Sequence, residues 1–168
     1  NWGLGRPVYL VTGQPQGLFK YKNRTTGVAS TAGKYASAFA LGSQLLANYY
    51  PTFAENLLQK AKDAYEYGKQ FPGVCQTAPG RAPYFYEEDN YVDDMELAAA
   101  QLAQTTTAGA TLWKEAAAFG RKEPSTPWMG ADTAKHYQWY PFVNLGHYWL
   151  SKHSNVTQTE FRQLMKLG

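Results

Sequence analysis

Residues 30–48 read STAGKYASAFALGSQLLAN, a run of small and apolar residues that contains no proline. This pattern predicts a first helix over Ser30–Asn48. Because the spacing is helical, the larger apolar side chains in and just after this run share one face of that helix. They are Tyr35, Ala38, Phe39, Gly42, Leu45, Leu46 and Tyr49.

Five further helices are predicted downstream of this run. Two of them begin at capping boxes, Thr52 with Glu55 and Thr157 with Glu160. The carboxylates of Asp93 and Asp94 are predicted to cap the third helix. The five predicted helices run from Pro51 to about Lys69, over Met95–Gln104, over Ala110–Phe119, over Tyr140–Lys152, and from Thr157 to Gly168.

Tight and long connections alternate between these helices. Residues 1–28 are rich in Gly, Pro and Gln and predict a loop, and residues 71–92 hold three prolines and two glycines. The sequence therefore predicts an all-α fold of three helical hairpins in one domain, with a loop-rich lead-in over 1–28 and hairpins over 29–168. Because long loops in compact domains are usually functional, we expect a binding surface on the side that carries them.

Composition excludes several classes of protein. The chain has 168 residues, 44% of them hydrophobic, which indicates a globular domain and excludes disorder. No apolar run is long enough to span a membrane, and a net charge of +3 is low for a nucleic-acid-binding protein. A single cysteine excludes an internal disulfide. The first residues hold neither an initiator Met nor a secretion signal, so we expect a piece of a longer protein.

Residues 87–96, EEDNYVDDME, hold six of the 13 acidic residues. Within them, Asp89, Asn90, Asp93 and Asp94 offer the oxygen ligands that Ca²⁺ prefers, although their spacing is not that of a calcium-binding helix-loop-helix. The alternative is a solvated loop whose carboxylates cap a helix, where the helix dipole favours negative charge. The residues alone leave both interpretations open.

Aromatic residues are abundant, and several fall in predicted loops or at helix starts. Such rings stack on sugars through apolar contact, or else anchor the loops to the core. A cluster favours a binding role more than a single ring does. The residues concerned are Tyr84, Phe85, Tyr86, Tyr91, Trp128 and Trp139.

Four long stretches of the sequence resemble glycoside hydrolase family nine, the endoglucanases and related cellulases of bacteria and plants, and most closely its Bacteroidetes-like members. They are RPVYLVTGQPQG at 6–17, TGVASTAGKYASAFALGS at 26–43, PGVCQTAPGRAPYFYEEDNYVDDMELAAAQL at 72–102, and TPWMGADTAKHYQWYPFVNLGHYWL at 126–150. The resemblance covers nearly the whole chain.

The resemblance implies a toroid of six helical hairpins, (α/α)6, of which this chain holds about three. It also implies hydrolysis of β-1,4-glucan with inversion, by an Asp base from a D-A-G-D motif and a distant Glu acid. This sequence contains no D-A-G-D, and no Glu in it matches the acid. We therefore expect cleft and scaffold from this chain, but no catalytic residue.

The resemblance also implies residue roles. Tyr86, or Phe85 if the gap is placed differently, matches a tyrosine that touches the sugar, and Trp139 matches a stacking tryptophan. Tyr91 opens a segment that resembles the family's Y-x-D-E-L, which with its preceding loop supplies calcium ligands. The side chains that match the calcium ligands are Asp89, Asp93 and Asp94, with the amide of Asn144 where some members carry a fourth carboxylate.

The resulting expectation is a fragment of a secreted or periplasmic endo-β-1,4-glucanase (cellulase). Its partners would be a β-1,4-glucan polysaccharide or oligosaccharide and the rest of its own catalytic domain, with a structural Ca²⁺ and no nucleic acid or membrane. Since a fold alone does not imply a function, a non-catalytic glycan-binding module and a helical interaction scaffold are the alternatives.

Overall fold

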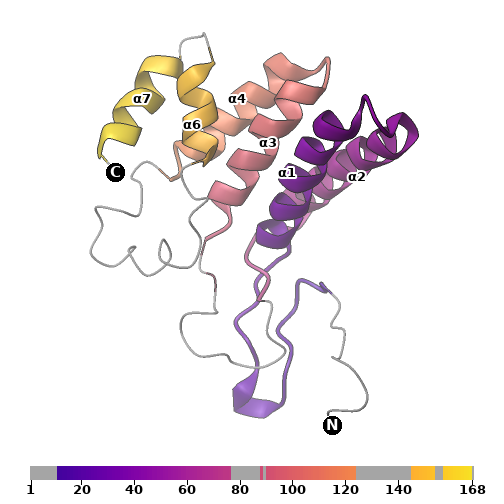
Figure 1. Cartoon of the computed structure of the whole chain (residues 1–168). Helices are drawn as coiled ribbons and strands as arrows, with labels where there is room; N and C mark the ends of the chain where they lie inside the picture. The colour runs from indigo at the N-terminus through magenta and orange to yellow at the C-terminus, as the bar shows by residue number, and fades with distance from the viewer. Residues whose placement is uncertain (1–10, 77–87, 89, 124–144, 154–156, 168) are drawn as a thin grey trace.

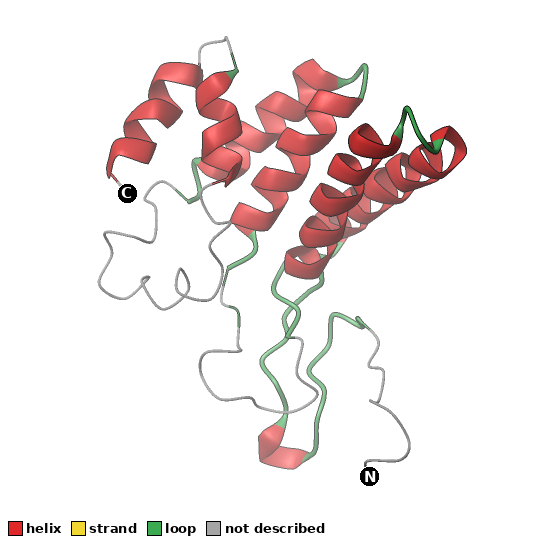
Figure 2. Cartoon of the chain, viewed as in Figure 1, coloured by secondary structure: helices red, strands yellow, loops and turns green. Residues whose placement is uncertain are grey.

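The structure is a computed structural model that describes residues 11–76, 88, 90–123, 145–153 and 157–167. In this part of the chain every regular element is helical, which confirms the predicted all-α class (Figure 2). A short 3₁₀ turn, η1, covers Phe19–Tyr21. The helices are α1 (Ala29–Leu46), α2 (Pro51–Gln70), α3 (Val92–Thr105), α4 (Gly109–Gly120), α6 (Leu145–Lys152) and α7 (Thr157–Leu167).

The helices form three antiparallel hairpins, α1 with α2, α3 with α4, and α6 with α7, which stack side by side (Figure 1). Helices α1, α3 and α6 run in the same direction, and α3 packs against both α1 and α6. The described part of the chain therefore has the repeated-hairpin arrangement expected of part of an (α/α)6 toroid. None of the described helices combines the length and hydropathy that crossing a bilayer requires.

Helix α3 lies at the centre of this stack. Ten of its 14 residues are buried, and Ala98, Ala99 and Ala100 are fully inaccessible to solvent. Alanine favours the helix and lets neighbouring backbones approach from several sides at once. The core around α3 also takes larger side chains from other helices: Tyr65 on α2, Leu150 on α6 and Phe161 on α7.

The buried face of α1 differs from the apolar stripe in its sequence. Tyr35 and Leu45, both in that stripe, are 53% and 65% exposed, whereas the buried residues are small: Ala29, Ser30, Ala32, Gly33, Ala36, Ala40 and Ser43. The reason is the closeness of α3, since a Cβ on Gly33 would lie 2.7 Å from the backbone carbon of Asp94. Close helix packing selects small side chains, so the larger ones lie outside the contact.

The predicted fifth helix is described only in part, as α6. Its buried residues are Gly146, His147, Leu150 and Ser151, whereas Leu145 at its first position is 40% exposed. Residues 140–144, where this helix was predicted to begin, lie outside the described residues.

The predicted helix caps are wrong in detail. Helix α2 begins at Pro51 after Tyr50, so Thr52 is not its N-cap. Helix α3 begins at Val92, three residues before the predicted start at Met95. Asp93 and Asp94 therefore lie inside its first turn, where the helix dipole still favours their negative charge. The carboxylate of Glu160 pairs with Arg121, the residue directly after α4, rather than with its own helix start. For Asp94 and Glu160, a cation from another element takes the place of the predicted cap contact.

We predict that Gly33→Ala destabilises the protein by about 1–3 kcal/mol, because the added methyl group forces α1 and α3 apart. Gly42→Ala is the matched control on the same helix. There the added Cβ meets only the end of the flexible Leu57 side chain, at 3.3 Å, and alanine favours a helix over glycine by about 1 kcal/mol. Urea unfolding followed by circular dichroism measures both changes. Equal stability of the two variants would contradict the close α1–α3 contact.

Candidate functional site

The long connections start or end at one end of the stack. Residues 11–28 lead into α1, residues 71–91 lead into α3, and residues 121–144 lead into α6, whereas the turns at 47–50 and 106–108 lie at the opposite end (Figure 1). Because α1, α3 and α6 run in parallel, their N-terminal ends lie together. The predicted one-sided placement of the long loops is therefore confirmed at the described helix ends.

Hydroxyl groups join the chain before α1 to the chain after α2. Thr26 Oγ1 accepts a hydrogen bond from the backbone N–H of Val74 (3.0 Å), and Ser30 Oγ accepts one from Cys75 (2.9 Å). Thr25 Oγ1 accepts a third from the N–H of Gln76 (3.0 Å). Backbone N–H groups in a buried loop need hydrogen-bond acceptors, and these three hydroxyl groups accept from three successive residues. Residues 74–76 are thus fixed against the start of α1.

Glu88 lies next to this junction and is held through its backbone. The Gln76 side chain donates a hydrogen bond to the carbonyl of Glu88 (2.6 Å) and accepts one from its N–H (2.8 Å). Both residues are buried. The Gln76 amide has both a donor and an acceptor, so it pairs with the N–H and the C=O of Glu88 as a neighbouring backbone would in a sheet. These two bonds fix the relative position of the two residues.

Lys34 joins three segments at this end of the stack. Its ammonium lies 2.5 Å from Glu88 Oε1 and 2.7 Å from Asp94 Oδ2. Burial disfavours the charged amine, but the carboxylates of Asp94 and Glu88 outweigh it and raise the pKa of Lys34 above its usual value. Burial, together with the neighbouring Asp93, raises the pKa of Asp94, and the ammonium opposes that rise. One cation thus pairs with two carboxylates from different segments.

A second buried ion pair lies deeper in the stack. His147 Nδ1 on α6 is 2.7 Å from Glu96 Oε1 and 2.9 Å from Oε2, and both side chains are almost inaccessible to solvent. Gly120 and Gly146 make room for the carboxylate, since a Cβ on either would come within 2.7 Å of an atom of Glu96. The ring of Phe161 meets the imidazole edge-on at a centroid distance of 5.0 Å.

Burial and pairing act in opposite directions on the pKa of each partner. Burial raises the pKa of Glu96 to about 7, while the hydrogen bond and charge of His147 work against that rise. Burial lowers the pKa of His147, but the hydrogen bond and charge of Glu96 outweigh it, so the pKa ends above its usual value. The backbone of Glu123 contributes in the same direction as Glu96. Because this pair fills a closed core site, its role is to join α3 to α6 rather than to meet a ligand.

Of the residues predicted to bind glucan, only Tyr91 is described. It is half-buried, precedes the first residue of α3, and packs against the core cluster around that helix. Its carbonyl accepts the N–H of Met95 at 3.1 Å. Phe85, Tyr86 and Trp139 lie outside the described residues, so the substrate-binding set stays a prediction.

Of the predicted calcium ligands, Asp93 and Asp94 are described, and Asp89 and Asn144 are not. Asp93 is buried in the first turn of α3, and Asp94 is bound by the Lys34 ammonium, which a divalent cation close by would repel. Among the described residues, no three His, Cys, Asp or Glu side chains lie close enough to hold a metal ion. These residues do not form a calcium site by themselves, and calcium stays a prediction that depends on Asp89 and Asn144.

Sequence reasoning did not assign roles to Lys34, Gln76, Glu88, Glu96 or His147. A signal was present for Lys34, since it is the one charged residue of α1 and lies among small, apolar neighbours. A lysine in such a helix needs a carboxylate partner from elsewhere in the chain. The partner itself, 54 or 60 residues away, follows only from the packing.

The arrangement defines an all-α protein of stacked hairpins whose long connections meet at one end. Comparison with known families agrees, because the sequence model of glycosyl hydrolase family 9 matches residues 1–166. The chain belongs to glycosyl hydrolase family 9.

Two curated relatives come from Arabidopsis thaliana. The chain is 35% identical to Endoglucanase 15 over 78 residues, which is 46% of this chain and 16% of the relative. It is 32% identical to Endoglucanase 14 over 101 residues, 60% of this chain and 20% of the relative. The chain thus spans a fifth or less of these relatives' lengths. No solved structure matches the chain.

We predict that His147→Ala lowers the free energy of unfolding by about 3–5 kcal/mol, because it leaves the Glu96 carboxylate buried without its cation. Arg121→Ala is the control, since it removes an ion pair to Glu160 whose side chains are 52% and 38% exposed. Its expected cost is about 0–1 kcal/mol. Urea unfolding separates the two values, and a His147→Ala loss no larger than the control would refute the importance of the buried pair.

Proposed function

We propose that this chain is part of the catalytic domain of a cellulase-type endo-β-1,4-glucanase that acts with inversion, and that it supplies cleft and scaffold. The observation that carries the proposal is the family match over residues 1–166, together with two relatives named as endoglucanases. The proposed substrate is a β-1,4-glucan polysaccharide or oligosaccharide. Because such a polysaccharide lies outside the cytoplasm, the protein would be secreted or periplasmic.

The position of the long connections supports a cleft at the N-terminal ends of α1, α3 and α6. Helix N-termini present backbone N–H groups, and the connections between them hold Tyr84, Phe85, Tyr86 and Trp139 in the sequence. Aromatic rings beside polar groups are what a sugar-binding cleft uses. The opposite end, with its short turns, offers no comparable set of connections.

The state of the described carboxylates supports a scaffold role. Inversion needs one carboxylic acid, one carboxylate and a water between them. Asp94 and Glu96 are engaged by Lys34 and His147, and Glu115 accepts a hydrogen bond from the Tyr65 hydroxyl at 2.7 Å. A carboxylate engaged in this way by a side chain of its own chain is not placed to act on an attacking water. We therefore place the base and the acid in other parts of the domain.

The isolated 168-residue chain is expected to release no reducing sugar from carboxymethylcellulose, because the attacking water has no base and the leaving oxygen no acid. The complete protein that carries this chain should release it. A reducing-sugar assay with a buffer blank measures both. Activity of the isolated chain would overturn the division of roles, and an inactive complete protein that still binds glucan would favour the non-catalytic alternative.

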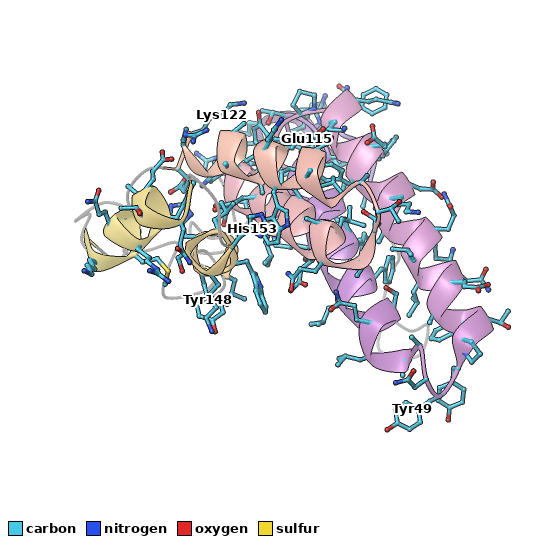
Figure 3. The ribbon with its side chains drawn as sticks, turned by 90° about the horizontal axis from the view of Figure 1, so that it is seen from above. Tyr49, Glu115, Lys122, Tyr148 and His153 are labelled. Carbon is cyan, nitrogen blue, oxygen red and sulfur yellow. The ribbon has the colours of Figure 1, made fainter. Side chains whose placement is uncertain are left out.

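Substitution of the predicted cleft aromatics tests the binding face. In the complete protein, Tyr86→Ala and Trp139→Ala should each raise KM for a soluble glucan about tenfold, since an aromatic contact contributes about 1.4 kcal/mol, which is tenfold in affinity. Tyr49→Ala is the control. Tyr49 is 77% exposed and lies at the turn between α1 and α2, at the end away from the long connections (Figure 3). Equal effects at Tyr49 and Tyr86 would place the cleft elsewhere.

A further inference from the structure

The chain before α1 forms a loop with a closed base. The backbone N–H of Asn23 donates a hydrogen bond to the carbonyl of Gln16 (2.8 Å), and the side-chain oxygen of Asn23 accepts one from the N–H of Gln16 (3.0 Å). Asn23 is 3% exposed. Thr25 and Thr26, which follow it, bind the backbone after α2. Residues 17–22, called the tip below, are therefore carried on a base that is fixed to the packed helices.

Three large apolar side chains of the tip are exposed to solvent. Leu18 is 75% exposed, Phe19 87% and Tyr21 61%. The tip contains the turn η1, which lies apart from the helices, on the side of the connections that lead into α1, α3 and α6 (Figure 2). Isolated exposed apolar residues are common on protein surfaces, but several in one short turn indicate a contact surface.

The backbone of Phe19 is strained. Its φ is +49°, and among the described residues no other residue except glycine has a positive φ. Side chains disfavour this region of backbone conformation. The turn is closed by the Tyr21 N–H on the carbonyl of Leu18 (2.9 Å) and by the Lys22 N–H on the carbonyl of Phe19 (3.4 Å). Such strain gathers at sites that contact ligands, where it fixes a side chain for its partner.

The chemistry of the tip fits a sugar chain. Aromatic faces pack on the C–H faces of sugar rings, and polar groups beside them bind the hydroxyls. The Lys20 ammonium lies 5.3 Å from the centre of the Tyr21 ring, so a hydrogen-bond donor accompanies the aromatic surface. Phe19 and Tyr21 thus combine the two kinds of group that recognition of a glucan needs.

Other exposed apolar side chains occupy a different kind of surface. Tyr35 on α1 and Phe53 on α2 are 53% and 54% exposed, and both lie on helix faces. In a toroid of hairpins, neighbouring hairpins pack on such faces. The tip lies past the helix ends, so packing between hairpins does not account for its exposed rings.

We propose that Phe19 and Tyr21 form an additional glucan-binding platform, which contacts a polymer chain beyond the N-terminal ends of the helices. The inference rests on the proposed function, from which it takes the substrate, and adds to it two binding residues. Phe19 and Tyr21 touch the substrate in this arrangement, whereas Asn23 is a positioning residue that holds the base of the tip.

Affinity electrophoresis of the complete protein tests the platform, because it measures binding without requiring hydrolysis. The gel contains hydroxyethylcellulose, a neutral and soluble β-1,4-glucan derivative. Phe19→Gly and Tyr21→Ala should each weaken binding about fivefold, the size of one aromatic contact. Phe53→Ala and Tyr49→Ala are the matched controls. Both remove an exposed ring near the opposite end of the stack and should bind as the wild type does.

Urea unfolding of the Phe19 variants separates a ring that meets a ligand from a ring that meets protein. Glycine adopts a positive φ without strain. Phe19→Gly should therefore unfold at a urea concentration at or above that of Phe19→Ala, and both should stay close to the wild type. A clear loss of stability in both variants would show that another part of the protein covers the ring, and it would overturn the proposal.

An anionic polymer tests whether charge rather than stacking holds the glucan, since Lys20 and Lys22 flank the rings. In gels that contain carboxymethylcellulose, Phe19→Gly should lose about as much affinity as it loses with the neutral polymer, about fivefold. A loss seen only with carboxymethylcellulose and reproduced by Lys20→Met would assign the binding to charge and overturn the platform.

The wild-type protein distinguishes failure of this inference from failure of the proposed function. If the wild type binds glucan and both tip variants bind equally well, the platform is overturned and the proposed function stands. If the wild type binds neither polymer, both are overturned. Binding that depends on Phe19 in a protein that releases no reducing sugar would support the platform and contradict the hydrolase.

Discussion

The burial of most of α3 is the constraint from which the rest of the structure follows. A helix in that position has little solvent-facing surface on which to place polar residues, yet its first turns hold Asp93, Asp94 and Glu96. Carboxylates in such a place need cations or donors from neighbouring elements. The neighbours supply them in order: α1 contributes Lys34 to Asp94, and α6 contributes His147 to Glu96.

These two ion pairs determine how the neighbouring helices align along their axes. Packing of alanine against alanine is nearly uniform along a helix, so a small sliding of one helix past another costs little contact area. A charge pair at a single position removes that freedom, because a displaced partner leaves a buried charge unpaired. The glycines act in the same direction, since Gly33 makes room for Asp94, and Gly120 and Gly146 both make room for Glu96. Small residues allow the approach of the helices, and the buried pairs determine where it occurs.

The sequence predicted the helices and their hairpin order well, because apolar spacing and turn residues are local signals. Their ends were less accurate, and Asp94 shows why: it has the properties of a cap but pairs with a lysine 60 residues earlier. The buried face of α1 was also missed, since the close approach of α3 favours Ala36 and Ala40 over Tyr35 and Leu45. The partners of Lys34 and His147 depend on packing between hairpins, which periodicity within one helix does not contain.

The same constraint bears on where chemistry can occur. A carboxylate that completes a buried pair has its position and protonation state set by the fold, so the described acids of α3 serve assembly. Groups that act on a substrate need access to it and freedom to change protonation. In this architecture binding groups are expected on the connections that lead into the N-terminal ends of α1, α3 and α6, because loops placed by a rigid scaffold commonly carry such groups. The polar contacts of Gln76, Glu88 and Lys34 lie at that boundary, where they join the chain before α3 to the packed helices.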